Sequence, residues 1–225
     1  MTVSARIDEI RNGFSPTFWI ANTLELFERL AFYGTKAVLA YYLATKVGLQ
    51  DEAATLTGWF STIIFSLPIV AGVFVDRYGF RKTLMTCFAM FAVGYFAIGV
   101  AGMEYGASIT QAIGLRNYVI IVLMLTAIGG SLIKPCIVGT VAKTSKPEAQ
   151  TLGFSIYYTL VNLGGTIGPI VALTIRKNLG IEYVLMMSSL TSALLFIGTF
   201  FFFKEPQSEN EEADKRTFGK VFQDM

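Results

Sequence analysis

Long apolar stretches separated by short polar ones dominate the pattern along the chain. A helix that spans a bilayer needs about 20 largely apolar residues, and six stretches reach that length. They cover residues 17–44, 53–75, 83–102, 117–141, 152–175 and 182–203. These runs are continuous, whereas the strands of a membrane barrel alternate and are about half as long. The pattern therefore predicts an all-α integral membrane protein, with six spanning helices joined by short connections.

The composition agrees with a bilayer as the surrounding solvent. Of the 225 residues, 53% are hydrophobic and only 15% are charged, which is too apolar for a soluble domain. The formal net charge of +2 does not suggest a nucleic-acid partner. Because the chain has no histidine, any proton-coupled step has to use carboxylates.

The sequence lacks the usual features of an enzyme. Cys87 and Cys136 both fall in apolar stretches without metal-ligand spacing, so we interpret them as packing residues. No nucleophile has a recognisable partner base, and no group of residues has the spacing of a metal site. The sequence therefore predicts neither catalysis nor a bound metal.

Lysine and arginine residues in the connections set the expected orientation. Cytoplasmic loops carry an excess of these residues, and placing residues 1–16 in the cytoplasm gives that bias. The cytoplasmic set is then Arg6, Arg11, Arg77, Arg81, Lys82, Lys143, Lys146, Lys204, Lys215, Arg216 and Lys220. The outer set is Lys46, Arg116, Arg176 and Lys177. We expect both termini in the cytoplasm, residues 17–203 in the bundle, and the plasma (inner) membrane as the location.

A charged segment follows the last apolar stretch, over residues 204–225. Its first part is highly charged and its second part is partly apolar. A mobile terminal tail would explain this composition. The start of a central cytoplasmic loop that leads to a seventh helix would explain it as well, and we favour this interpretation.

The first apolar stretch carries a stripe of polar and aromatic residues at spacings of three and four. Its members are Glu25, Glu28, Arg29, Phe32, Tyr33 and Lys36. This spacing places them on one face of a helix. Each ionisable group costs at least about 2.5 kcal/mol at the membrane centre, so the stripe must line a wet cavity or pair inside the bundle. The alternative is a buried structural ion pair, of Glu28 with Arg29 or with a neighbouring helix, that has no transport role.

The fourth stretch contains a single charged residue, Lys134, next to Pro135, which disturbs a helix. A lone lysine in an apolar helix needs a counter-charge. We therefore expect Lys134 to pair with Glu25 or Glu28. The alternative is a lysine whose ammonium group reaches the cytoplasmic surface.

The fifth stretch presents Tyr158 and Asn162, four residues apart and hence on one face. Asn162 has both donor and acceptor groups for a polar ligand. Gly164 and Gly168 follow on the same helix and allow close approach of a neighbouring helix.

Several of these motifs resemble those of a known family. Asp76, Arg77, Gly79, Arg81 and Lys82 form a loop that resembles the signature loop of the major facilitator superfamily. Within that superfamily, three further stretches resemble motifs of the proton-dependent oligopeptide transporters. They are Glu25-Leu-Phe-Glu28-Arg29, Ile133-Lys134-Pro135, and the fifth-helix run from Phe154 to Asn162.

The resemblance implies a fold of twelve or more helices in two six-helix bundles, of which this chain would be the N-terminal bundle. That bundle would consist of two inverted three-helix repeats. The implied function is proton-driven symport of small peptides or peptide-like solutes, with protons as the coupling ion and no other cofactor. The implied partners are the peptide, the lipid bilayer and a second six-helix bundle. The alternatives are a carrier for a sugar, nitrate or drug, and a membrane interaction module that transports nothing.

The resemblance also implies roles for single residues. Glu25, Glu28 and Arg29 would couple proton uptake to movement. Lys36 and Lys134 would hold the peptide carboxylate, and Tyr33 and Asn162 would form hydrogen bonds with the peptide backbone. The signature loop of Asp76, Arg77, Gly79, Arg81 and Lys82 would act as a charge relay that helps to hold one closed state.

The chain departs from the family pattern at three places around this expected site. Phe32 and Phe65 stand where tyrosine is common, and Lys36 stands where arginine is common. Each missing phenol removes a possible ligand hydrogen bond, which contributes on the order of 1 kcal/mol. These departures bear on which peptides or peptide-like solutes would be carried.

Overall fold

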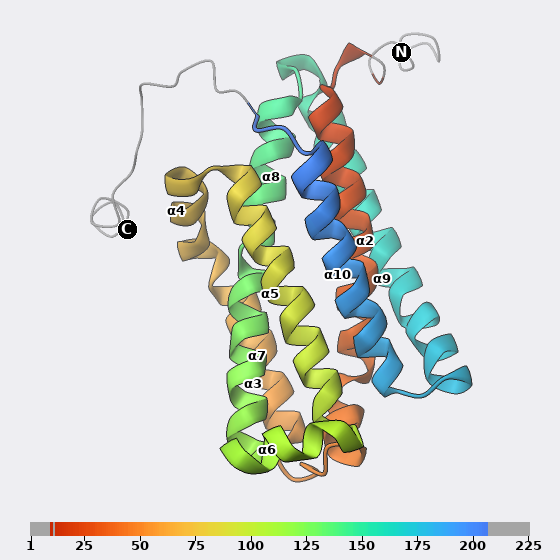
Figure 1. Ribbon diagram of the computed structural model, residues 1–225. Coiled ribbons are helices and arrows are strands. Elements are labelled where there is room, and N and C mark those ends of the chain that lie inside the picture. Colours follow the sequence, from red (N-terminus) through yellow and green to blue (C-terminus); the bar gives the residue numbers. More distant parts are fainter. Residues whose placement is uncertain (1–9, 11, 207–225) are drawn as a thin grey trace.

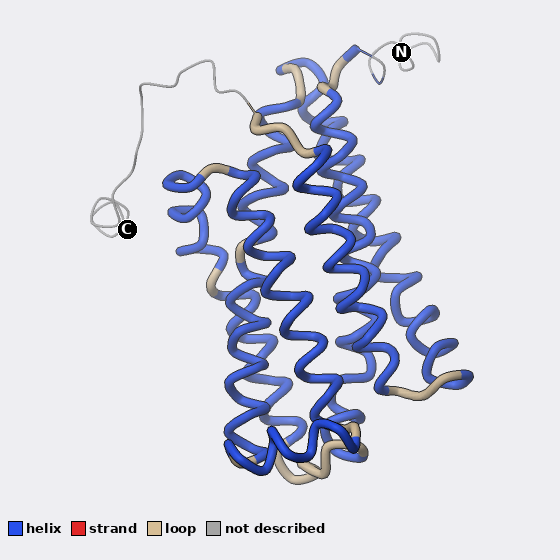
Figure 2. The backbone as a smooth tube through the Cα atoms, in the orientation of Figure 1, coloured by secondary structure: helices blue, strands red, loops and turns tan. Residues whose placement is uncertain are grey.

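The computed structural model describes residues 10 and 12–206, and these form a long bundle of helices (Figure 1). The long helices are α2 (Pro16–Thr45), α3 (Ala53–Ser66), α4 (Pro68–Tyr78), α5 (Phe80–Ala101), α7 (Leu115–Ser131), α8 (Ile133–Thr144), α9 (Gln150–Asn178) and α10 (Glu182–Phe202). The short ones are η1 (Glu104–Gly106), α6 (Ala107–Ile113) and η2 (Pro147–Ala149). Helix makes up almost all of the described backbone (Figure 2). The predicted all-α class is confirmed.

Two predicted segments fall largely on residues that the structure does not describe. These are residues 1–16 and 204–225, which we expected to be cytoplasmic. The basic residues Arg6, Arg11, Lys215, Arg216 and Lys220, which were used to predict the orientation, also lie outside the described residues.

Each of the six predicted stretches is helical. The six correspond in order to α2, α3 with α4, α5, α7 with α8, α9, and α10. Among the described residues, four segments are long and apolar enough to cross a membrane by themselves, and α3 with α4 forms a fifth, bent by 50°. The remaining helix, α2, has 30 residues but carries four acidic or basic side chains, Glu25, Glu28, Arg29 and Lys36. Length and apolar composition alone therefore do not confirm exactly six spans, although each of the six predicted stretches is helical.

Two of the six stretches are interrupted near a proline. The α3 and α4 helices meet at Leu67, directly before Pro68, and α7 and α8 meet at Leu132, three residues before Pro135. A proline lacks the backbone N–H group, and its ring clashes with the carbonyl four residues earlier, so a helix can kink or break there, although α9 continues through Pro169. The predicted disturbance at Pro135 is confirmed. As a result, Phe65 and Lys134 both lie beside helix ends.

The packing partners show the symmetry of two three-helix units. The α2 helix packs against α9 and α10, and its counterpart in the second unit, α7, packs against α3 and α5. The α5 and α10 helices, which are the third of each unit, pack against each other. Exchanging the two units leaves this set of pairs unchanged, as expected for two repeats of three helices.

Glycines allow α2 and α9 to approach each other closely. A Cβ atom added at Gly168 would lie 2.6 Å from the carbonyl oxygen of Leu30, and one at Gly164 would lie 3.0 Å from that of Leu26. Any larger side chain would force the two backbones apart. The predicted packing role of both glycines is confirmed.

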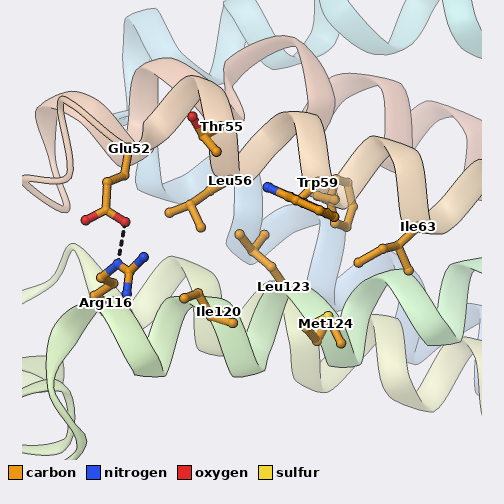
Figure 3. Close-up of a pocket in the computed structure, with 10 residues that line it drawn as sticks. Glu52, Thr55, Leu56, Trp59, Ile63, Arg116, Ile120, Leu123 and Met124 are labelled. Carbon is orange, nitrogen blue, oxygen red and sulfur yellow. Dashed lines mark hydrogen bonds and ion pairs between the residues drawn. The ribbon is translucent and has the colours of Figure 1, made fainter.

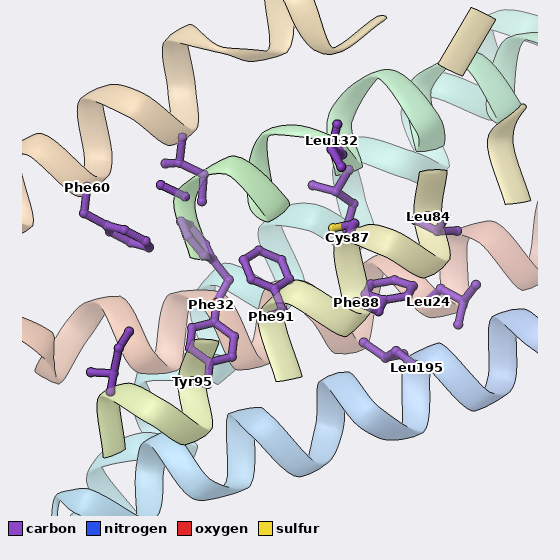
Figure 4. Packing of buried hydrophobic residues seen from close by; sticks show 14 of the residues in the cluster. Leu24, Phe32, Phe60, Leu84, Cys87, Phe88, Phe91, Tyr95, Leu132 and Leu195 are labelled. Carbon is purple, nitrogen blue, oxygen red and sulfur yellow. The ribbon is translucent and has the colours of Figure 1, made fainter. Parts of the chain in front are cut away.

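The core of the bundle is apolar and rich in aromatic rings (Figure 4). Phe32 on α2 and Phe88, Phe91 and Tyr95 on α5 are almost completely buried within it. Cys87 lies in the same cluster, and both it and Cys136 are free and buried, as the packing interpretation predicted. This core holds the polar face of α2 in place.

Candidate functional site

Three of the four charged residues in the stripe on α2 lie in the interior of the bundle, whereas Lys36 is exposed. Glu25 and Glu28 are each 1% exposed, and Arg29 is 4% exposed. The Arg29 Nε atom donates a hydrogen bond to the Glu28 carboxylate and lies 3.4 Å from Oε1 of Glu25. One guanidinium group therefore serves two carboxylates, and we call Glu25, Glu28 and Arg29 the charged triad.

The triad leaves polar atoms without hydrogen-bond partners. Within the described part of the chain, Oε1 of Glu28 is buried and accepts no hydrogen bond, and the carboxylate oxygens of Glu25 are buried with no well-formed hydrogen bond, Tyr157 being the polar side chain beside them. Buried carboxylate oxygens are normally satisfied, so each such atom calls for an explanation. These oxygens are available to a proton or to a donor that arrives later.

Aromatic rings cover the triad on the side that leads to Lys36. The Arg29 guanidinium carbon lies 4.9 Å from the centre of the Phe32 ring and 5.8 Å from that of Tyr33. Cations are attracted to the faces of aromatic rings at such distances. Tyr33 is half-buried, and its ring lies against Gly165 of α9.

Lys36 and Lys134, far apart in the sequence, lie close to the same aromatic ring. The Lys36 Nζ atom is 4.7 Å from the centre of the Phe65 ring, and the Lys134 Nζ atom is 5.7 Å from it. Both lysine side chains are exposed, and Phe65 is 44% exposed. The structure thus gathers two positive charges around one phenyl ring, at an open surface next to the triad.

The expected ion pair of Lys134 with the triad is not formed in this structure. Among the described residues, no oxygen of Glu25 or Glu28 lies within ion-pair distance of Lys134. Direct pairing of Lys134 with Glu25 or Glu28 in another conformation stays a prediction.

Asn162, predicted to bind the ligand backbone, is exposed on α9. It lies one turn before Gly165, against which the Tyr33 ring packs. Tyr157 of α9 is buried beside Glu25. The α9 helix, which packs against both α2 and α8, therefore forms one side of the site.

The signature loop lies between α4 and α5. Gly79 has a φ angle of 81°, which favours glycine, and the chain turns there from one helix into the next. Asp76, Arg77 and Lys82 are exposed, and no ion pair between described residues joins Asp76 to the basic residues of the loop. Arg81 instead donates a hydrogen bond to the carbonyl oxygen of Phe200 at the end of α10. The charge relay stays a prediction.

Sequence reasoning missed Glu205, whose carboxylate contacts the signature loop. It also missed a cleft of about 410 Å³ between α3 and α7 (Figure 3). The cleft is mostly apolar, with Trp59 on one wall, and an ion pair of 2.6 Å between Arg116 and Glu52 lies at one end. None of the residues predicted for the site lines this cleft.

The family is shown by comparison with known proteins. Residues 23–224 match the model of the Major Facilitator Superfamily. The chain belongs to this superfamily and is an integral membrane protein.

The relatives with similar sequences include members of this superfamily that are named as peptide permeases or peptide transporters. The chain is 28% identical over 172 residues to dipeptide and tripeptide permease B of Aliivibrio fischeri, covering 74% of this chain and 32% of the permease. It is 28% identical over 159 residues to peptide transporter family 1 of Drosophila melanogaster, covering 68% of this chain and 20% of that protein. The chain therefore spans at most about a third of these two relatives.

Solved structures of similar fold include POT family transporters. The POT family transporter PepTSo superimposes with a TM-score of 0.69 at 18% identity, covering 86% of this chain and 39% of that one. A POT family transporter in complex with 5-aminolevulinic acid gives a TM-score of 0.69 at 20% identity, and the match covers 92% of this chain and 43% of that transporter. The fold is thus that of a major facilitator bundle, and the predicted resemblance to the oligopeptide transporters is confirmed.

Proposed function

We propose that the chain is the N-terminal bundle of a proton-coupled carrier for small peptides or peptide-like solutes. The observation that carries this proposal is the charged triad, in which one arginine is buried with two carboxylates next to two exposed lysines. The similarity to peptide permeases supports the substrate class. The proposed activity is transport rather than catalysis.

The charge count of the triad gives the reason for proton coupling. Glu25, Glu28 and Arg29 together carry one negative charge when all three are ionised. A net charge inside a membrane protein is costly, and binding of one proton to a carboxylate removes it. The buried Oε1 of Glu28, which accepts no hydrogen bond, provides a place for this proton. Protons are therefore the proposed coupling ion, and no other cofactor is needed.

Lys134 offers a link between the proton and the ligand. Its ammonium group lies against the Phe65 ring, which is next to the Phe32 ring that covers Arg29. A ligand carboxylate bound to Lys134 would neutralise the lysine charge and so reduce the positive charge near the triad, which would then bind a proton more readily. By thermodynamic linkage, proton binding then strengthens ligand binding by the same factor.

The ligand end that this bundle would hold is the carboxylate. Lys36 and Lys134 offer two ammonium groups around Phe65, and Tyr33 and Asn162 would add hydrogen bonds to the peptide backbone. One similar transporter is described in complex with 5-aminolevulinic acid and another with a thioalcohol-conjugated peptide. These molecules fit the class of small, carboxylate-bearing peptides and peptide analogues.

The remaining parts of the carrier follow from the same proposal. Alternating access needs a second six-helix bundle, which would cover the face that bears the two lysines. The excess of Lys and Arg at one end of the bundle supports cytoplasmic termini. A plasma (inner) membrane location is part of the same proposal. In Figure 1 the start of α2, the loop between α4 and α5, and the end of α10 all lie at that end.

Uptake by the complete carrier in liposomes tests the proposal. We expect Glu28→Gln to abolish accumulation of labelled dipeptide driven by an inward proton gradient, because the triad then carries no charge for a proton to neutralise. Exchange of internal for external dipeptide should continue, since exchange needs no net proton movement. Glu148→Gln, an exposed site at the cytoplasmic end, is the matched control. Gradient-driven accumulation that persists in Glu28→Gln would reject the role of the triad.

A carrier for another solute is the second candidate. The observation that favours it is the phenyl ring of Phe65 between the two lysines, because this ring offers no hydroxyl group to a peptide. The two candidates are separated by measuring how unlabelled dipeptides, sugars and nitrate each reduce the uptake of labelled dipeptide. If only dipeptides reduce this uptake, the result supports the peptide carrier.

A further inference from the structure

The signature loop and the end of α10 meet at the cytoplasmic end of the bundle (Figure 1). The α5 helix begins there at Phe80 and α10 ends there at Phe202. The first four N–H groups and the last four carbonyl groups of any helix lack partners within that helix. The residue before α5 is Gly79, which has no side chain to cap the helix. Both helix ends therefore need partners from elsewhere.

Glu205 supplies the partner for the start of α5. The backbone N–H of Phe80 donates to Oε1 of Glu205 at 2.6 Å, and that of Arg81 donates to Oε2 at 2.9 Å. A single carboxylate thus caps the first two residues of a helix that lies about 125 positions earlier in the chain. A negative charge at this position also complements the helix dipole.

Arg81 supplies the partner for the end of α10. Its guanidinium group donates to the carbonyl oxygen of Phe200, and its central carbon lies 5.5 Å from the centre of the Phe200 ring. A positive charge at the last turn of a helix complements the dipole as well. Each of the two helix ends therefore receives a side chain of the appropriate charge from the other.

The loop is shaped to accept this contact. A Cβ atom at Gly79 would lie 2.8 Å from Oε1 of Glu205, so only glycine leaves room for the carboxylate. On the other side, the ammonium group of Lys143 lies 4.9 Å from the centre of the Phe80 ring. Lys143 belongs to α8, the helix that carries Lys134 near its first residue. The start of α5 is thus held between α8 and the segment that leaves α10.

We propose that Glu205 and Arg81 form a two-way clasp, and that Glu205 is the positioning residue of the signature loop. The clasp ties the loop to the segment that follows α10. The loop cannot move away from that segment unless both amide hydrogen bonds to Glu205 break. The clasp itself does not depend on what the carrier transports, whereas its part in transport rests on the function proposed above.

Amide hydrogen exchange of the 225-residue chain in lipid nanodiscs tests the clasp directly. The amides of Phe80 and Arg81 have no partner within α5, so we expect Glu205→Ala to speed their exchange by roughly tenfold or more. Glu205→Gln keeps a single carbonyl oxygen, so exchange should rise mainly at one of the two amides. Glu148→Gln, at an exposed glutamate of the same end, should change neither amide.

The outcomes separate a clasp from a general loss of stability. Faster exchange at Phe80 and Arg81 with unchanged exchange in the middle of α5 supports the clasp. Parent-like exchange at both amides in Glu205→Ala overturns it. If Glu205→Ala does not assemble, Glu205→Gln alone tests the proposal. Unequal loss of exchange protection at the Phe80 and Arg81 amides is expected only if a carboxylate binds both amides in the parent. An equal change at both amides, or no change, overturns the proposal.

Uptake by the complete carrier tests the part that the clasp plays in transport. Because Glu205 is remote in sequence and contact from Lys36 and Lys134, Glu205→Ala should change the maximal rate severalfold and the half-saturation concentration by less than about twofold. If the maximal uptake rate of Glu205→Ala is unchanged, the clasp has no role in transport. The amide hydrogen-exchange measurement then still tests whether the clasp exists. A parent carrier that takes up no peptide refutes the proposed function instead, and the exchange measurement still stands.

Discussion

Removing Arg29 should destabilise the bundle, because two carboxylates would then be buried without a counter-charge. In Arg29→Gln the triad would carry two negative charges in place of one when both carboxylates are ionised. The Arg29 Nε atom lies 3.4 Å from Glu25 Oε1, and at an effective dielectric constant of about 20 the attraction at this distance is about 5 kcal/mol. The desolvation of the guanidinium group disappears with it and offsets part of this loss. Breaking a buried pair from one side costs about 3–5 kcal/mol, and we expect a value in that range.

Unfolding in mixed micelles of a mild detergent and SDS can measure this change, with the fluorescence of the two tryptophans as the signal. A second substitution sharpens the test. Arg29→Gln combined with Glu28→Gln restores a single negative charge, so the double variant should be more stable than Arg29→Gln alone. Arg116→Gln is the matched control, because Arg116 also pairs with a glutamate but is 63% exposed. An exposed pair contributes about 1 kcal/mol at most, so the control should lose little.

Two results would refute this reasoning. The first is an Arg29→Gln variant that loses no more free energy of unfolding than Arg116→Gln. The second is a double variant that is no more stable than Arg29→Gln alone. Either result would mean that the charges of the triad do not govern its stability.

Two further substitutions test the packing and the ligand surface. Gly168→Ala should lower the free energy of unfolding by about 1–3 kcal/mol, because the new Cβ atom would lie 2.6 Å from the Leu30 carbonyl oxygen. The control is Gly72→Ala, where nothing lies within 4 Å of a Cβ atom, and an equal loss in both variants would contradict the close-packing argument. Phe65→Tyr adds a hydroxyl group beside Lys36 and Lys134 and should tighten dipeptide binding by roughly fivefold, the equivalent of one hydrogen bond of about 1 kcal/mol. Phe96→Tyr, exposed on α5, is its control, and no gain in competition assays with Phe65→Tyr would place Phe65 away from the ligand.

The sequence was sufficient to predict the helices because apolar stretches of spanning length follow directly from the thickness of the bilayer. The break at Pro135 was predictable for a local reason, since a proline disturbs the turn before it. The break at Pro68 follows from the same rule, although the second stretch was expected to be one helix. Local spacing therefore predicts where helices lie better than where they bend.

The site could be predicted only as far as residues on one helix face determine it. The spacing of Glu25, Glu28 and Arg29 placed them together, and burial in the bundle confirms that they do not face lipid. Contacts between distant elements were not predictable in the same way. Nothing local to Glu205 indicates that it caps a helix that starts at Phe80, and nothing local to Phe65 indicates that two lysines surround it.

The movement of protons that accompanies peptide entry tests the central claim most directly. The complete carrier is reconstituted in liposomes that contain a pH-sensitive dye, without an initial proton gradient, and a zwitterionic dipeptide is added outside. The single uncompensated charge of the triad predicts that the interior acidifies as peptide enters, with about one proton for each peptide. The Glu28→Gln carrier should show no acidification. Saturable peptide entry by the parent carrier with no change in internal pH would contradict the account.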